Sequence, residues 1–359
     1  MNAFTFTGPT IAPLPALPVA AALVHDAEWL AQGFDSSGRA MHFVHVPRAA
    51  LRDLSFLTDQ ALRERERRTI GLDLVERSLA DIDRVPVHYI FHTAFCGSTL
   101  LTRALEQLGA GASLKEPGLL TNLLYYLGRW SDGDDQRRIG LAAAMLARPI
   151  GDASATIVKP SCFASPLAPA LLAARPSSRA VFLSGSLRDF LAAVAKRSIR
   201  GRTWARRAYA DAMRSMPFDF HFTHSDLLEL TDLQIAGLAW LMRTCFLRQA
   251  AASVAPGRVL ELQFADLRNS PESTLSRAVQ FLGAECSQDQ IRQTLDGPVF
   301  AHHAKQPGQA YTMAARDDEM ATALATHGEE IETVADWVEA VAGGFGLHGP
   351  ATPRAQSAH

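Results

Sequence analysis

A short turn rich in small and hydroxyl-bearing residues, FHTAFCGSTLL at positions 91–101, has the composition of an anion-binding loop. The apolar run Val87–Phe91 predicts a buried strand before the turn, and the leucines and alanines that follow Ser98 have helical spacing. A strand, a tight turn and a helix N-terminus together direct backbone N–H groups and the positive end of a helix dipole at one point. Gly97 allows close backbone approach, and the Ser98 and Thr99 hydroxyl groups add donors. The segment therefore predicts a site for phosphate or sulfate groups.

The turn lacks the lysine of an ATP-binding P-loop. In that pattern, G-x-x-x-x-G-K-[ST], a lysine follows the last glycine and contacts the transferring phosphate, whereas Ser98 stands there in this chain. The turn instead resembles the phosphosulfate-binding loop of sulfotransferases, roughly P-[KR]-S-G-T-[TS]-x-L, whose S-G-T-T-L-L part matches residues 96–101. The proline and the catalytic lysine or arginine of that loop fall on Ala94 and Phe95. The resemblance implies a P-loop fold and the donor 3′-phosphoadenosine 5′-phosphosulfate, with no metal.

Two later segments fit the same family in part. The stretch GSLRDFLAA resembles the cofactor segment R-[DN]-P-x-D-x-x-x-S. Asp189 matches, whereas the arginine that holds the 3′-phosphate and the serine fall on Gly185 and Ala193. Residues 260–284 resemble the pattern Y-E-D-L-x-x-D-P-x-x-x-L-x-x-x-x-x-F-L-G. The resemblance thus covers about residues 87–285.

Glu116 and Lys159 are the predicted catalytic residues. The resemblance places Glu116 where many sulfotransferases carry the base that takes the acceptor's proton, and a solvated Lys-Glu pair in a turn is the alternative. Lys159 ends the strand predicted over Ala155–Lys159, at the sheet edge where open α/β sheets bind ligands. It could supply the charge that the loop lacks at Phe95, an effect worth about 3–4 kcal/mol. A surface lysine at a strand end is the alternative.

A run of basic residues follows the second segment. Six cations lie in twelve residues: Lys196, Arg197, Arg200, Arg202, Arg206 and Arg207. Arginine binds phosphate oxygens in pairs, so the run is a candidate holder of the 3′-phosphate, and a solvated helix face is the alternative. The residues that we predict to bind the donor are Thr93, Phe95, Cys96, Gly97, Ser98, Thr99, Leu100, Ser186, Arg188, Arg197 and Arg200.

The overall composition excludes several other classes. The net charge of −2 gives no electrostatic case for nucleic acid as a partner. Three prolines interrupt the apolar stretch Ile11–Val24, so we expect neither a signal peptide nor a membrane span. The four cysteines and the histidines lack metal-ligand spacing. We therefore expect a reduced, cytoplasmic compartment and no metal site.

Strands and helices alternate from Val87 onward, which is typical of a parallel sheet covered by helices on both faces. Further strands are predicted over Ala180–Ser184 and Val259–Gln263, with a short one before Lys115. We predict an α/β P-loop fold of three layers with a mostly parallel central sheet over residues 85–345. A small N-terminal extension or cap, 1–84, precedes it, and a disordered tail, 346–359, follows it. Outside the main sheet we expect a strand over 40–46 and helices over 60–77, 226–252 and 317–342.

The combined prediction is an enzyme, a sulfotransferase that transfers a sulfuryl group from the phosphosulfate donor to a hydroxyl or amine of a small-molecule or peptide acceptor. Two alternatives stay open. One is a nucleotide-dependent phosphotransferase, with Thr99 on a metal and Asp189 or Asp266 beside it. The other is a catalytically silent nucleotide-binding protein, because the loop and the second segment both lack residues that act in the family. The sequence indicates neither the acceptor nor the oligomeric state.

Overall fold

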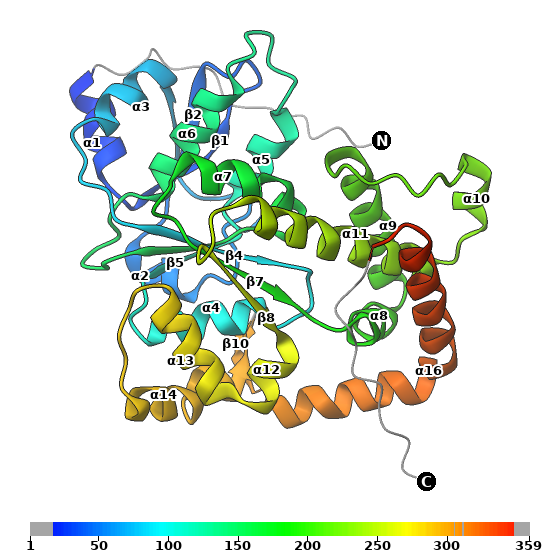
Figure 1. The fold of residues 1–359 in the computed structure, drawn as a ribbon. Helices are drawn as coiled ribbons and strands as arrows, with labels where there is room; N and C mark the ends of the chain where they lie inside the picture. Colours follow the sequence, from blue (N-terminus) through cyan, green and yellow to red (C-terminus); the bar gives the residue numbers. More distant parts are fainter. Residues whose placement is uncertain (1–16, 305, 311, 348–359) are drawn as a thin grey trace.

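A five-stranded parallel sheet forms the centre of the protein (Figure 1). The computed structural model describes residues 17–304, 306–310 and 312–347. The strand order is β5-β6-β4-β7-β8, and all four neighbouring pairs are parallel. The strands are β4 (Val87–His92), β5 (Ala112–Lys115), β6 (Thr156–Lys159), β7 (Ala180–Ser184) and β8 (Val259–Gln263). The predicted α/β architecture with a parallel sheet is confirmed.

Helices cover both faces of this sheet because successive strand residues point to opposite sides. In β4, Tyr89 and Phe91 belong to one apolar cluster, which includes residues of α5, α6 and α7, whereas Ile90 belongs to another, formed with α4 and α13. Figure 1 shows α4, α12 and α13 on one side of the sheet and α5, α6 and α7 on the other. Their bounds are α4 Ser98–Gln107, α5 Gly118–Tyr126, α6 Asp135–Leu146, α7 Ala168–Ala174, α12 Phe264–Asn269 and α13 Pro271–Phe281.

A third apolar cluster lies beside the sheet, where four long helices pack together (Figure 1). These helices are α8 (Leu187–Ala195), α9 (Ser198–Ser215), α11 (Asp232–Ser253) and α16 (Met313–Gly344). The helix predicted over 226–252 is two helices, because α10 (His224–Glu229) ends before Thr231 starts a new capping box at the N-terminus of α11. The last helix is longer than predicted at both ends. The predicted tail lies outside the described residues from position 348 onward.

The segment between β8 and α16 adds short elements near the sheet edge. They are α14 (Gln288–Leu295), α15 (Pro298–Ala301) and the two-stranded pair β9 (His302–His303) and β10 (Gln306–Ala310). A 3₁₀ helix, η1 (Cys162–Leu167), follows β6. Among the residues described, no helix is both long enough and apolar enough to cross a membrane.

The N-terminal part forms a small antiparallel sheet, β1-β2-β3. Its elements are α1 (Leu17–His25), β1 (Trp29–Phe34), β2 (Ala40–His45), α2 (Arg48–Asp53), β3 (Arg67–Gly71) and α3 (Leu72–Leu79). The helix predicted over 60–77 is wrong: residues 67–71, which begin with two arginines, pair as an edge strand with β2, and the helix starts only at Leu72. Apolar residues of this part share one cluster with those of the main sheet, and the domain boundary at residue 84 stays a prediction.

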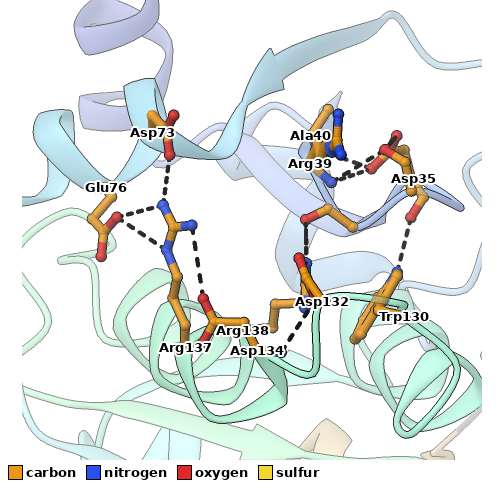
Figure 2. A network of polar contacts seen from close by, with 12 residues as sticks. Asp35, Arg39, Ala40, Asp73, Glu76, Trp130, Asp132, Asp134, Arg137 and Arg138 are labelled. Atoms are coloured by element: carbon orange, nitrogen blue, oxygen red, sulfur yellow. Dashed lines mark hydrogen bonds and ion pairs between the residues drawn. The ribbon is translucent and has the colours of Figure 1, made fainter.

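Two arginines of α6 connect the main domain to this N-terminal part, as Figure 2 shows. The buried Arg138 guanidinium donates to Gly38 O at 3.1 and 3.0 Å, binds both carboxylate oxygens of Asp132 at 2.8 and 2.6 Å, and lies 4.4 Å from the centre of the Trp130 ring. Hydrogen bonds from Arg138 hold the pKa of Asp132 well below its usual range. Arg137 instead pairs with exposed carboxylates of α3.

The first prediction compares these two neighbouring arginines. Arg138→Met removes the N–H groups that Gly38 O accepts, so we expect the free energy of unfolding to fall by about 1–3 kcal/mol. Arg137→Met removes only surface ion pairs, worth about 0.2–1 kcal/mol. Urea unfolding of both variants measures the difference. Equal destabilisation would show that the buried contact of Arg138 adds nothing to folding.

The second prediction concerns pH and the buried His88 in β4. Its Nδ1 accepts the Arg179 N–H at 3.2 Å, and burial lowers the pKa of the imidazole to about 4. Between pH 6.5 and pH 4 the His88 imidazole therefore takes up a proton in the unfolded chain but not in the folded chain. The contribution of His88 to the free energy of unfolding is fully present above pH 6.5 and falls as the pH drops towards 4. Urea unfolding at pH 7 and pH 5 should show a smaller acid loss for His88→Gln than for the wild type. An identical loss would mean that other groups cause the acid sensitivity.

Candidate active site

The loop after β4 has the backbone of an anion-binding turn. Ala94, Phe95 and Gly97 have φ values of 71°, 53° and 74°, in the left-handed region. Left-handed residues within a short turn direct successive N–H groups to one concave side. A side chain at Gly97 would place its Cβ 2.5 Å from the Phe264 ring, so glycine is required there for packing as well as for conformation. Helix α4 begins at Ser98, directly after this turn.

Thr99, in the first turn of α4, carries a buried hydroxyl that lacks a partner. The residue is 3% exposed and lines a cavity, and its Oγ1 makes no hydrogen bond among the described residues. Thr102, one turn later, is equally buried, but its Oγ1 donates to Ser98 O at 2.8 Å. Because a buried polar group without a partner costs free energy, the Thr99 hydroxyl marks a position where a polar ligand atom fits.

Three residues hold the turn against neighbouring strand ends. The Ala94 N–H donates to Nδ1 of His92 at 3.1 Å, so the proton of this imidazole is on Nε2, which donates to Pro160 O at 3.1 Å. Thr93 Oγ1 accepts the Gly185 N–H at 3.4 Å, and Cys96 Sγ donates to Leu183 O. Burial raises the pKa of the Cys96 thiol. Thr93 and Cys96, both predicted to bind the donor, therefore lie beneath the loop and support it.

A cavity of about 250 Å³ lies above the loop. The predicted residues Phe95, Gly97, Ser98, Thr99, Leu100, Glu116 and Arg197 line it. The basic run that the sequence analysis singled out also contributes Lys196. The sequence analysis missed other lining residues, among them Phe56, His92, Ser161, Phe163, Trp204, Phe264 and Arg316. His92 and Ser161 could have been identified, since His92 directly follows one predicted strand and Ser161 lies two residues after another. Phe56 and Arg316 come from parts of the chain that give no signal of their own, whereas Phe264 lies in the segment 260–284, which resembles the family without marking a site residue.

Glu116 lines the cavity and forms a close ion pair with the buried Lys159. Lys159 Nζ lies 2.6 Å from Glu116 Oε1, and the Lys159 side chain is only 1% exposed. The Glu116 N–H also donates to Lys159 O at 2.6 Å, which fixes Glu116 at a positive φ of 55°. A buried ammonium needs a counter-charge, and Glu116 supplies it. The sequence analysis predicts that Lys159 faces the anion. The structure places the Glu116 carboxylate directly beside the Lys159 ammonium group.

Three cations also line the cavity, and they come from α8, α9 and α16 or the residues that flank them. Lys196 forms an ion pair of 2.6 Å with Glu319. The Arg197 guanidinium lies 4.3 Å from the centre of the Phe95 ring, which also contacts Trp204. Arg316 lies in the first turn of α16.

The other predicted donor-binding residues occupy structural positions. The Arg188 side chain reaches three carboxylates of α16, which belong to Glu332, Asp336 and Glu339. Ser186 is the N-cap of α8, where its hydroxyl accepts the Asp189 N–H at 3.1 Å. Arg200 is exposed on α9. Within the described residues, no three or more His, Cys, Asp or Glu side chains gather in a way that could hold a metal ion.

No protein-family model matches this chain, and no curated protein matches it. Several solved structures are similar in fold. A sulfotransferase domain from the curacin biosynthetic pathway is 11% identical, with 75% of this chain and 100% of that chain covered and a TM-score of 0.37. A sulfotransferase from Mycobacterium tuberculosis H37Rv is 14% identical, covering 68% and 79%, with a TM-score of 0.41.

A third similar structure is a retinol dehydratase in complex with androsterone and inactive cofactor PAP. It is 12% identical, covering 94% of this chain and 98% of that chain, with a TM-score of 0.35. These values assign no activity, and any function has to be argued from the residues of this chain. The chain is similar to solved sulfotransferases, which is the family that its sequence motifs resemble.

Proposed function

We propose that this protein binds 3′-phosphoadenosine 5′-phosphosulfate at the loop after β4 and transfers its sulfuryl group to a hydroxyl or amine. The single observation that carries the proposal is the buried, unpartnered Thr99 hydroxyl at the N-terminus of α4, in a turn with three residues at positive φ. The residues present fit such a donor, because N–H groups, hydroxyl groups and cations all line one cavity. The donor would supply a sulfuryl group that is bonded to a phosphate, and the phosphate would be the leaving group.

The loop favours sulfuryl transfer over phosphoryl transfer from a nucleoside triphosphate. The eight residues from Thr93 to Leu100 contain no lysine or arginine, and Ser98 stands where an ATP-binding loop has its lysine. Asp266, a metal-side candidate in the phosphotransferase alternative, is a capping residue: its Oδ2 accepts the Gln263 N–H at 3.1 Å. The phosphosulfate carries less charge at the transferring group than a triphosphate does, so a loop of N–H and hydroxyl donors suits it.

In this proposal Glu116 accepts the proton of the acceptor. Its Oε1 is held by Lys159, and Oε2 has no hydrogen-bond partner among the residues that the structure describes. The carboxylate lines the cavity with a side chain that is 19% exposed, so an acceptor hydroxyl can reach it. Lys159 orients the Glu116 carboxylate, which is a positioning role. General-base catalysis of this kind contributes a factor of about 10²–10⁴ in rate.

The third prediction tests the anion site through Thr99. Thr99→Val keeps the shape of the side chain and removes the hydroxyl. We expect the affinity for adenosine 3′,5′-bisphosphate to fall by about 10-fold to 100-fold. This factor corresponds to the loss of one hydrogen bond to a charged group, which is worth about 1.5–3 kcal/mol. The unliganded protein should be as stable as the wild type or more so, because the lost group had no partner. Isothermal calorimetry and thermal unfolding measure the two effects.

Thr102→Val is the matched control, since Thr102 is as buried as Thr99 but bonds to Ser98 O within the helix. Its affinity for the bisphosphate should stay within about twofold, and its stability should fall by about 1 kcal/mol. If Thr99→Val binds the bisphosphate as tightly as the wild type, the anion site is not at this hydroxyl and the proposed function loses its basis.

The fourth prediction tests Glu116 as the base. Glu116→Gln should lower turnover by about 10²–10⁴ while leaving the affinity for the bisphosphate unchanged. Transfer of radioactive sulfate from the donor to a panel of phenols, alcohols and amines measures turnover. Glu106→Gln is the control, because Glu106 lies 3.9 Å from the buried Lys115 in a comparable pair away from the cavity. If Glu116→Gln is fully active, Glu116 is not the base and serves only as the counter-ion of Lys159.

A further inference from the structure

The anion loop contains no cation of its own. Its residues Thr93–Leu100 offer backbone N–H groups and hydroxyl groups only. When a sulfuryl group leaves a phosphate, negative charge builds on the oxygen that joined the two, and a positive group there speeds the reaction. If the function proposed above is right, a cation from another part of the chain has to reach the loop.

Most of the cations near the cavity are held by other contacts. Lys159 is buried against Glu116, and Lys196 is paired with Glu319. The guanidinium of Arg197 lies over the ring of Phe95 and bonds to Ala193 O. Each of these three groups therefore already has a partner within the protein.

Arg316 is the cation that contacts the loop backbone. Its Nη2 donates to Phe95 O at 3.0 Å, and the guanidinium lies 4.1 Å from the centre of the Phe264 ring. The same ring packs against the backbone at Gly97, so the two contacts place Arg316 at the turn itself. The carbonyl contact uses one of five guanidinium N–H groups, and Arg316 lines the same cavity as Ser98.

The charge of Arg316 is available to a ligand. Among the described residues the structure shows no ion pair between Arg316 and a carboxylate. The neighbouring acid, Asp317, lies 3.6 Å from Arg268 instead. A guanidinium fixed by a carbonyl and an aromatic face keeps its full positive charge and loses little freedom when it binds an anion.

We propose that Arg316 supplies the positive charge for the transferring sulfuryl group, and so acts as a catalytic residue delivered by α16. In the transfer step a bond forms between the acceptor atom and sulfur. The bond between sulfur and the bridging phosphate oxygen breaks, and its electron pair stays on that oxygen. The acceptor's proton goes to Glu116, and Arg316 stabilises the charge that develops around the sulfuryl and bridging oxygens.

The test compares two ligands that differ only in the sulfuryl group. Equilibrium dialysis measures the Kd of 3′-phosphoadenosine 5′-phosphosulfate and of adenosine 3′,5′-bisphosphate for the wild type and for Arg316→Met. We expect the phosphosulfate to bind about 10-fold to 100-fold more weakly to the variant, with the bisphosphate within about twofold. Turnover should fall by about 10²–10³. Arg268→Met, which removes the exposed neighbour paired with Asp317, should change neither Kd nor turnover.

Equal weakening of both ligands would overturn the inference, because Arg316 would then contact a part that both share. An unchanged Kd for the phosphosulfate would overturn it as well. If Arg316→Met does not fold, Arg316→Lys keeps a positive charge with fewer donors, and it should retain part of the preference for the phosphosulfate. A wild-type protein that binds neither ligand would instead reject the proposed function, a result distinct from failure at Arg316.

Discussion

The backbone of the turn after β4 is the constraint on which the cavity depends. Non-glycine residues in the left-handed region cost about 1–3 kcal/mol each, so Ala94 and Phe95 keep this conformation only because neighbours hold it. Each holding contact comes from a different element: Pro160 lies after β6, Gly185 after β7 and Arg316 in α16. The parallel sheet brings these points together because its strands all end at the same edge. The strained turn is therefore stable only in the complete fold.

The charges around the turn are arranged in two groups. Beside β5 and β6, the charges of the buried Lys159 and of Glu116 nearly cancel. Near α8 and α16, three cations line the cavity, namely Lys196, Arg197 and Arg316, and Glu319 pairs with the first of them. The second group therefore gives the cavity a positive potential that attracts anions.

Much of the sheet could be predicted from the sequence because parallel strands buried on both faces read as short apolar runs. The four strands predicted with bounds match β4, β6, β7 and β8 to within a residue or so. The edge strand β3 was mistaken for a helix, since its residues 67–71 contain two arginines and a single large apolar side chain, Ile70, and so show no apolar alternation. Glu116 and Lys159 were identified separately, but their mutual contact depends on the pairing of β5 with β6, which local patterns do not encode.

The contact between Arg316 and Phe95 joins positions 221 residues apart in the chain. Closing so long a loop costs entropy before any contact repays it, so such contacts form late in folding. A chain emerging from the ribosome can therefore complete its parallel sheet before α16 has been synthesised. The turn after β4 would lack the contact from Arg316 until the chain had been made as far as α16. A partly made chain would thus have its sheet in place while Ala94 and Phe95 were still free to leave the left-handed conformation.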